Sequence, residues 1–216
     1  MYYRDEFINE SLLFSHQDLC LNIDKWKPGQ NNILFVTGHM GSGKSTIAKE
    51  YAKQYRATYI EIDNFFFFID DTDKDIINRC IENCPKYKEY YDIYHSDNRK
   101  KKEIVSSEEA LAGCTEAISY AINELHKDIN NLYVIEGTII FTILDIELFK
   151  NEPIVIKGSS FLRSCIQAAK RVKMRDIESL KKNKNEIDMN FFFKTFFSNK
   201  YMEKQLKEFR DKIMDK

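Results

Sequence analysis

The glycine-rich segment GHMGSGKS, residues 38–45, constrains the fold of this chain more than any other stretch of its sequence. It fits the pattern G-x-x-x-x-G-K-[ST] at every fixed position and follows directly on the apolar run NILFVTG. That run lacks alternation, which is typical of a strand buried on both faces of a parallel sheet. The residues after it, 43–56, place apolar side chains at helical spacing. The sequence therefore predicts a strand, a tight glycine-rich turn and a helix in succession.

The same segment predicts a site for a chain of phosphates. Glycines let consecutive backbone N–H groups form a concave anion site, and the N-terminus of the following helix adds partial positive charge. Lys44 can reach the β and γ oxygens, and the hydroxyl of Ser45 can ligate Mg²⁺. We therefore expect ATP or GTP, with Mg²⁺, as the bound cofactor. The expected binding residues are Gly38, Gly41, Ser42, Gly43, Lys44, Ser45 and Thr46.

The rest of the chain alternates between strand and helix patterns. Runs rich in apolar residues predict further strands at residues 58–63, 131–137 and 152–158. Helices are expected near residues 73–83, over 108–127, from about 160 past 176, and over 188–214. Such an alternation predicts the α/β class, with a mostly parallel sheet that helices cover on both faces.

The length of 216 residues fits one main domain. We expect an N-terminal helical extension over residues 1–31, with a helix near residues 5–14 and with Trp26 as its anchor. The main domain is then expected over residues 32–216. Within it, residues 64–106 are rich in aromatic and charged side chains and are expected to form a substrate-binding insert or a lid.

Composition limits the partners and the location. The 33 lysines and arginines nearly balance the 34 aspartates and glutamates, so no nucleic-acid partner is expected. No apolar run approaches the roughly 20 residues of a membrane span, and charges stand where a signal peptide needs an apolar core. We therefore expect no membrane association and a cytoplasmic location. The five cysteines form no CxxC pair, and they are expected to be reduced.

Three further stretches carry candidate chemistry. Asp63 follows a predicted strand, where open α/β sheets bind ligands, and it could accept a proton from an acceptor hydroxyl; a turn or helix-cap aspartate is the alternative. Glu136 ends another predicted strand and could hold Mg²⁺ through water, or simply begin a loop. Four basic residues lie within KRVKMR, residues 170–175, and could neutralise phosphate charge or form a solvated helix face.

Taken in order, DNFF, VIEGTIIFTILDIELF and KRVKMRDIE resemble the uridine kinase and phosphoribulokinase-like branch of the P-loop kinases, over about residues 33–178. The resemblance implies a three-layer P-loop kinase fold with about five parallel strands and a mobile lid, here near residues 159–185. It implies Asp63 as the catalytic base, and Arg171 and Arg175 as lid residues on the phosphates.

The resemblance also implies that Ser45 and Glu136, together with Asp63, hold Mg²⁺, and that Lys44 acts on the phosphates. The chain departs from the family after Asp63. The histidine-proline-aspartate segment that helps to form the family's nucleoside pocket is replaced by KYKEYYDIYHSDNRKKKE, residues 86–103. The acceptor is therefore left open.

We expect a phosphotransferase that moves the γ-phosphate to an alcohol group of a small molecule, which could be nucleoside-, sugar- or vitamin-like. One alternative is an NTPase whose hydrolysis drives a regulatory or partner-binding change, and another is a kinase that acts on a macromolecule or a nucleotide sugar. The segment FFFKTFF, residues 191–197, could pack on the sheet or form a homodimer surface. The run FFFF, residues 65–68, is expected mostly in the core, with one or two rings able to stack on an acceptor.

Overall fold

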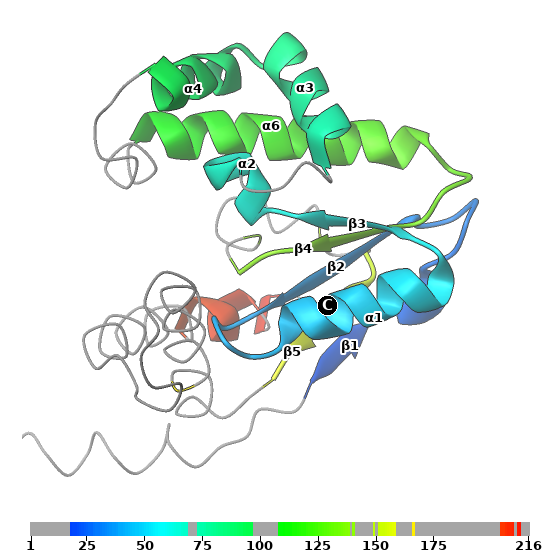
Figure 1. Cartoon of the computed structure of the whole chain (residues 1–216). Coiled ribbons are helices and arrows are strands. Elements are labelled where there is room, and N and C mark those ends of the chain that lie inside the picture. The colour runs from blue at the N-terminus through cyan, green and yellow to red at the C-terminus, as the bar shows by residue number, and fades with distance from the viewer. Residues whose placement is uncertain are drawn as a thin grey trace, which may run out of the picture.

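The computed structural model describes residues 18–68, 73–96, 108–138, 140, 149, 151–158, 166, 204–209 and 211–212. They form a five-stranded sheet of order β1-β5-β2-β4-β3, flanked by helices (Figure 1). The expected α/β class, with a mostly parallel sheet of about five strands between helical layers, is confirmed.

Four of the strands are those that the apolar runs predict. They are β2 (Ile33–Gly38), β3 (Thr58–Glu61), β4 (Tyr133–Glu136) and β5 (Ile154–Lys157). These four strands pair in parallel, with β2 between β4 and β5. Every residue of β2 and β4 is buried, because helices cover both faces of the sheet. The glycine-rich loop therefore leaves the sheet from its central strand.

The fifth strand comes from the segment expected to be an N-terminal extension. This strand, β1 (Leu19–Leu21), pairs antiparallel with β5 at the sheet edge. A short 3-10 helix, η1 (Ile23–Lys25), leads from β1 to Trp26, which is buried. The expected anchoring role of Trp26 is confirmed, because its ring packs on those of Tyr51 and Tyr55. The helix expected near residues 5–14 lies outside the described residues.

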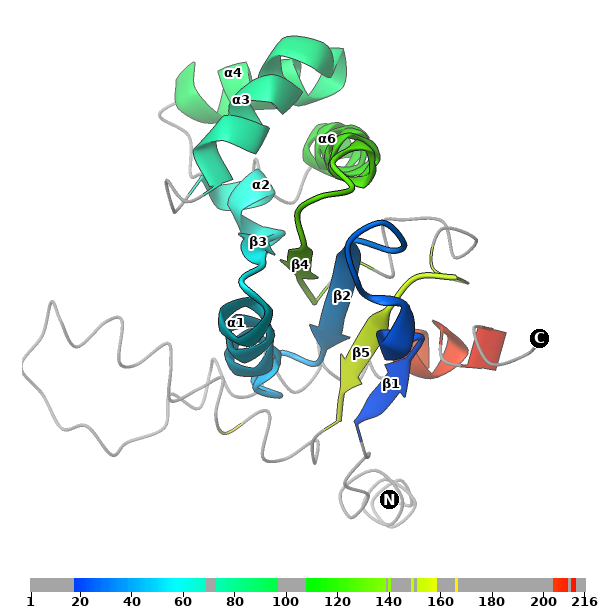
Figure 2. The same cartoon turned by 90° about the vertical axis from the view of Figure 1, so that its right-hand side faces the viewer.

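The helices lie on both faces of the sheet, as Figure 2 shows most clearly. They are α1 (Lys44–Tyr55), α2 (Asp63–Phe67), α3 (Lys74–Asn83), α4 (Pro85–Ser96) and α6 (Glu108–Lys127). The helix α1 covers one face, while α6 covers the other and carries α3 and α4 on its outer side. The helices expected near residues 73–83 and over 108–127 are therefore confirmed.

Two hydrophobic cores follow from the period of two along each strand. On β2, Ile33 and Phe35 enter the larger core beneath α6, whereas Leu34 and Val36 enter the smaller core beneath α1. The same alternation runs along β4, where Val134 enters the α1 core. Polar side chains at the carboxyl end of these strands therefore face α1 or α6 according to their parity in the sequence.

Three tyrosines of α4 fix the short helix α2 to the larger helical layer. Their hydroxyls donate to three consecutive α2 carbonyls, from Tyr87 to Phe65 (3.0 Å), from Tyr90 to Phe66 and from Tyr94 to Phe67 (3.1 Å). Phe65 and Phe66 are buried, as expected for most of this aromatic run, and Phe67 is exposed. The insert therefore packs as part of the domain, with α2 held along its length.

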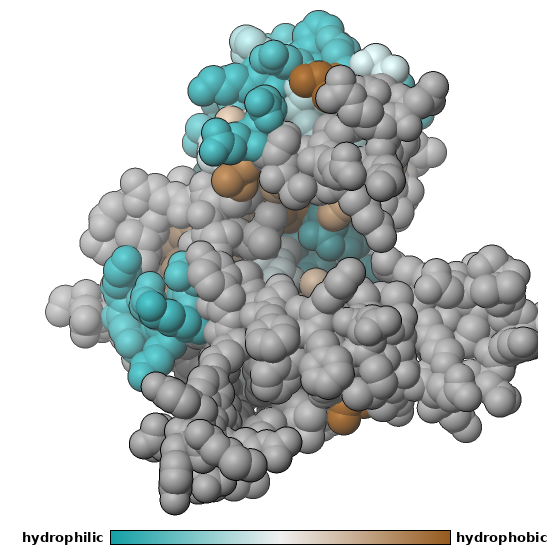
Figure 3. All heavy atoms as spheres, turned by 90° about the vertical axis from the view of Figure 1, so that its left-hand side faces the viewer, coloured by the Kyte–Doolittle hydropathy of each residue, from teal (hydrophilic) through white to brown (hydrophobic). Residues whose placement is uncertain are grey.

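Exposed apolar side chains are spread over the described surface. Figure 3 shows one face on which hydrophilic residues dominate the upper helical part and apolar residues occur separately. The large apolar side chains with the greatest exposure are Met40, Tyr55, Phe67, Leu111 and Ile129. Tyr55, Phe67 and Leu111 lie on three different helices, and Met40 and Ile129 lie in loops, so these side chains do not gather within one helix or strand.

The described cysteines are free thiols, and three of them are buried. Burial raises the pKa of the Cys80 thiol to about 12, so this thiol stays protonated at neutral pH. Cys165 lies outside the described residues. Among the helices described, none is both long and apolar enough to cross a membrane.

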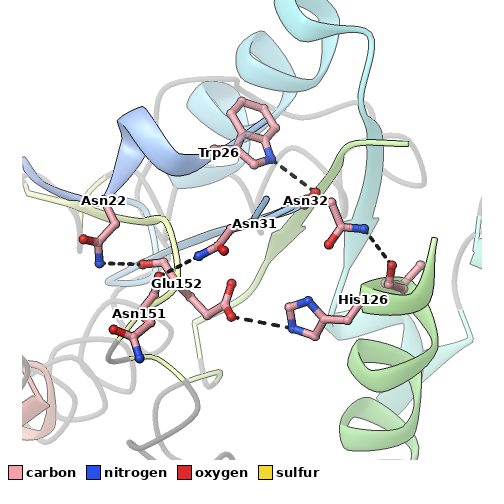
Figure 4. A network of polar contacts seen from close by, with 8 residues as sticks. Asn22, Trp26, Asn31, Asn32, His126, Asn151 and Glu152 are labelled. Atoms are coloured by element: carbon pink, nitrogen blue, oxygen red, sulfur yellow. Dashed lines mark hydrogen bonds and ion pairs between the residues drawn. The ribbon is translucent and has the colours of Figure 1, made fainter. Parts of the chain in front are cut away.

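A half-buried acid lies beside a histidine at the amino-terminal edge of the sheet (Figure 4). Glu152 Oε1 lies 3.7 Å from His126 Nε2, and Glu152 Oε2 is buried with no hydrogen-bond partner in the part of the chain described. The backbone oxygen of Glu152 accepts a bond from Asn22 Nδ2 at 3.2 Å. Burial raises the pKa of Glu152 to about 7 and lowers the pKa of His126.

This site makes stability depend on pH. The folded state keeps a proton on Glu152 that the unfolded state releases near its ordinary pKa of 4.5, so Glu152's contribution is lost as the pH rises from there to about 7. The lowered pKa of His126 acts in the opposite sense below its ordinary value of 6.5. Glu152→Gln removes only the first effect. We expect this variant to gain stability relative to wild type from pH 5 to pH 8, by at most about 3 kcal/mol.

Urea unfolding of both proteins at several pH values measures the difference. His126→Gln is the matched control, since it removes the neighbouring titration and keeps Glu152. A stability difference between wild type and Glu152→Gln that stays constant over this pH range would contradict the assignment.

Candidate functional site

The glycine-rich loop joins the central strand β2 to α1. Its glycines are required for two different reasons, the backbone conformation and the close approach of a neighbouring strand. Gly41 and Gly43 adopt φ values of 82° and 90°, which side-chain-bearing residues rarely adopt. A Cβ on Gly38 would lie only 2.8 Å from the carbonyl oxygen of Lys157 on the neighbouring strand β5. Substitution at any of these positions would therefore distort the loop.

The N-terminus of α1 opens into this loop. Gly43 occupies the N-cap position, and no side chain caps the first turn of the helix. Only the backbone closes the turn, since Thr46 N–H and Ile47 N–H donate to the Gly43 carbonyl at 3.1 and 3.2 Å. An uncapped helix N-terminus carries partial positive charge and free N–H donors, which suits an anion.

The predicted binding residues run from the last residue of β2, through the loop, to the first turn of α1. Gly38, Gly41, Ser42 and Lys44 are buried, Gly43 and Ser45 are half-buried, and Thr46 is exposed. The Ser42 hydroxyl is buried and has no hydrogen-bond partner among the described residues. This hydroxyl is therefore a buried polar group of the loop that the described residues leave without a hydrogen bond.

Glu136 meets the loop from the adjacent strand. In the parallel pairing of β2 with β4, Val36 lies opposite Glu136, which places this carboxylate beside the start of the loop. Glu136 Oε1 lies 3.5 Å from Lys44 Nζ, and the Glu136 side chain is only 2% exposed. A buried carboxylate requires such a partner, because an isolated charge is costly to bury.

Gly137 allows this close arrangement of strand ends. A Cβ at residue 137 would lie 2.7 Å from the Cβ of Ile62. The Gly137 N–H donates to the Val36 carbonyl at 3.2 Å, and the Thr37 hydroxyl donates to the Gly137 carbonyl at 2.8 Å. In the Glu-Gly pair, Glu136 therefore supplies the carboxylate, and Gly137 is required by the close packing against Ile62.

Two residues of β3 join this cluster, and sequence reasoning did not single them out. The Tyr59 hydroxyl lies 3.0 Å from Glu136 Oε2 and 3.4 Å from Glu61 Oε2. Burial and the neighbouring carboxylates raise the pKa of the Tyr59 phenol. Burial, with the charges of Glu136 and Asp63, raises the pKa of Glu61 as well. The alternation in TYIEID was the available signal, since it places Tyr59 and Glu61 on one face.

Asp63 begins α2, just past the carboxyl end of β3, and its side chain is exposed. Its charge acts on Glu61, so the two carboxylates lie at the same sheet edge. The buried side chain of Asp73 fixes the start of α2 through hydrogen bonds. This residue was not singled out from the sequence. Asp73 Oδ2 accepts bonds from Asn64 Nδ2 at 2.7 Å and from the Glu61 N–H at 3.2 Å.

The donors at this edge suit Mg²⁺. Carboxylates and a serine hydroxyl are the hard oxygen ligands that it prefers, and it usually takes one or two carboxylates together with phosphate oxygens and water. In the described part of the chain, no group of three or more acidic, histidine or cysteine side chains is arranged to hold a metal ion alone. Glu136 and Ser45 could supply one carboxylate and one hydroxyl ligand to such a metal.

Apart from residue 166, the predicted lid at residues 159–185 lies outside the described residues. This holds for Arg171 and Arg175 within it, and also for the aromatic segment at 191–197. Their expected roles on the phosphates and at a homodimer surface stay predictions.

Comparison with known proteins gives one family match. The family model described as Nephrocystin 3, N-terminal, matches residues 20–127, which is half of the chain. The match begins within β1 and ends with α6, so it spans the glycine-rich loop, β3 and the insert. This family stands in a P-loop NTPase-related context, which agrees with the coarser part of the expected resemblance and leaves the uridine kinase branch without support. No curated protein matches the chain.

Proposed function

We propose that this chain, which belongs to the Nephrocystin 3, N-terminal, family, binds an Mg²⁺·nucleoside triphosphate on the loop 38–45 and transfers the γ-phosphate to an alcohol group of a small molecule. The observation that carries the proposal is the loop itself. Its glycines with positive φ, the uncapped start of α1 and the buried Lys44 beside Glu136 are the parts that a triphosphate site requires.

Lys44 would exchange partners under this proposal. In the structure its ammonium lies 3.5 Å from Glu136 Oε1. Phosphate oxygens at the loop would compete for the ammonium, since Lys is a compact charge on a flexible stem. Glu136 and Ser45 would then hold Mg²⁺, which supplies neutralisation of phosphate charge when bound.

Asp63 is the proposed base towards the acceptor. The sheet order places β4 between β2 and β3, so Asp63 lies two strands from the loop. Two strand spacings amount to about 10 Å between the ends of β2 and β3, a separation that would accommodate a γ-phosphate and an acceptor hydroxyl. An exposed carboxylate at that distance can accept the hydroxyl proton as transfer proceeds. The proposed acceptor is nucleoside-, sugar- or vitamin-like, as in uridine kinase-like enzymes.

A second candidate function is favoured by the family match. The matching description names a domain of nephrocystin 3 and no kinase. The same loop would then hydrolyse the nucleotide, and the insert 64–106 would pass the change to a partner. A kinase acting on a macromolecule or a nucleotide sugar is a third reading of the same site.

An acceptor panel separates these functions. The purified chain is incubated with Mg²⁺·ATP, or Mg²⁺·GTP, and with nucleosides, sugars and vitamin precursors, and mass spectrometry measures nucleoside diphosphate and phosphorylated product. We expect product with one acceptor class and little free phosphate. Free phosphate released at one rate with every acceptor would contradict the kinase and favour the NTPase. Absence of nucleotide turnover and of nucleotide binding would contradict both.

A further inference from the structure

We propose that Tyr59 is a positioning residue for Glu136, and that its hydroxyl keeps one carboxylate oxygen directed at the loop for the Mg²⁺ that accompanies the nucleotide. This inference rests on the proposed function. It assigns a role to a residue that lies outside the glycine-rich motif and touches no phosphate in the proposed arrangement.

The geometry follows from strand register. Tyr59 and Glu61 project on the same face of β3, the face that lies beneath α1. In the parallel pairing of β3 with β4, Glu61 lies opposite Glu136, and Tyr59 lies opposite Val134. The tyrosine side chain is long enough to reach along the strand, so its hydroxyl lies between the two carboxylates. One phenol thus bridges the ends of two strands.

The Tyr59 hydroxyl donates its hydrogen bond to Glu136 in preference to Glu61. It has one proton to donate, and its distance to Glu136 Oε2 is 3.0 Å, against 3.4 Å to Glu61 Oε2. The two Glu136 oxygens therefore have different partners. Oε1 faces Lys44 at 3.5 Å, while Oε2 accepts a hydrogen bond from Tyr59. A carboxylate fixed at one oxygen presents the other in a defined direction.

The different partners of the two Glu136 oxygens become important when nucleotide binds. If Lys44 turns to the phosphates, Glu136 loses the cation that holds Oε1, and the Tyr59 bond then keeps the carboxylate oriented. The ring of Tyr59 is itself supported, since Lys49 Nζ on α1 lies 5.2 Å from its centroid. Groups that orient metal ligands typically change metal affinity by 10–100-fold when they are removed.

The test uses the full chain and compares Tyr59→Phe with Tyr133→Phe. The control is closely matched, because Tyr133 lies on the adjacent strand β4 and its hydroxyl donates to the carboxylate Asp128 Oδ2 at 2.6 Å. That bond lies at the opposite end of the sheet from the loop. Both substitutions remove one phenol oxygen that donates to a carboxylate.

Calorimetry measures ATP binding in EDTA and at graded Mg²⁺ concentrations, which requires no catalysis. We expect Tyr59→Phe to bind ATP in EDTA within about threefold of wild type and to need at least about tenfold more Mg²⁺ for half of the metal-dependent gain in affinity. Tyr133→Phe should show the wild-type Mg²⁺ dependence. Urea unfolding checks that both variants fold, since a purely structural role would lower stability without moving the Mg²⁺ dependence.

Three results would overturn the inference. The first is an unchanged Mg²⁺ dependence in Tyr59→Phe, and the second is an equal shift in Tyr133→Phe. The third is a shift as large in Glu61→Gln, because Glu61 and not Glu136 would then be the group that the hydroxyl serves. Failure of the proposed function looks different, since wild type would bind no ATP at any Mg²⁺ concentration, and both proposals would fall together.

Discussion

Lys44→Ala is expected to lower the affinity of the chain for ATP by about 100-fold and to abolish measurable turnover. A hydrogen bond to a charged group contributes about 1.5–3 kcal/mol, and each 1.4 kcal/mol is a factor of about ten in affinity. Lys44 is nine-tenths buried at the loop, so solvent screens its contact with phosphate only weakly. Calorimetric titration of ATP into wild type and variant measures the loss.

The same substitution also changes the protein without nucleotide. It leaves the carboxylate of Glu136 buried with the Tyr59 bond and without its ammonium partner, which costs stability. Urea unfolding must therefore accompany the binding measurement. In the double variant Lys44→Ala, Glu136→Gln the stability should return towards wild type, whereas ATP affinity should stay low.

Lys53→Ala is the matched control for Lys44→Ala. Lys53 lies in the last turn of the same helix, and its side chain is exposed. We expect ATP affinity within about threefold of wild type in this variant, since a solvent-exposed charge contributes little. Equal losses in the two variants would contradict a specific phosphate contact by Lys44.

The sheet and the loop were predictable because local rules determine them. A continuous apolar run can only be satisfied between two helical layers, and this is where β2, β4 and β5 lie. The glycine pattern likewise reflects backbone conformations that other residues avoid, at Gly41 and Gly43. Neither inference needed knowledge of distant contacts.

The edge strand β1 was beyond such rules. Three residues, Leu19–Leu21, are too few to show a period, and they form a strand only because β5 offers an unpaired edge. The sequence separation between the two strands exceeds 100 residues. Only the tertiary structure therefore shows that the segment before the glycine-rich loop contributes to the sheet.

The supporting residues of the site were missed for the same reason. Tyr59 acts on Glu136 and Asp73 acts on Asn64, and each contact depends on which strands and helices are neighbours. The predicted carboxylates Glu136 and Asp63 were found from their position after a strand, which is a local signal. Residues that orient them carry no comparable signal, because their partners are distant in the sequence.

Asp63→Asn is expected to keep ATP affinity within about tenfold of wild type and to slow phosphoryl transfer by about 10²–10⁴-fold, which is the usual contribution of a general base. The amide has the size of the carboxylate but cannot accept the hydroxyl proton. The backbone of α2 should stay in place, since α4 tyrosines hold its carbonyls and Asp73 holds Asn64. Single-turnover transfer to the acceptor from the panel measures the effect.

Asp75→Asn separates this role from a general loss of negative charge in the insert. Asp75 is an exposed aspartate in the first turn of α3, and we expect wild-type transfer from its variant. A kinase requires that Asp63→Asn loses transfer while it retains nucleotide, because the carboxylate acts only on the acceptor. An NTPase requires no acceptor base, so unchanged nucleotide turnover in Asp63→Asn would remove Asp63 from the chemistry and favour hydrolysis as the reaction of this site.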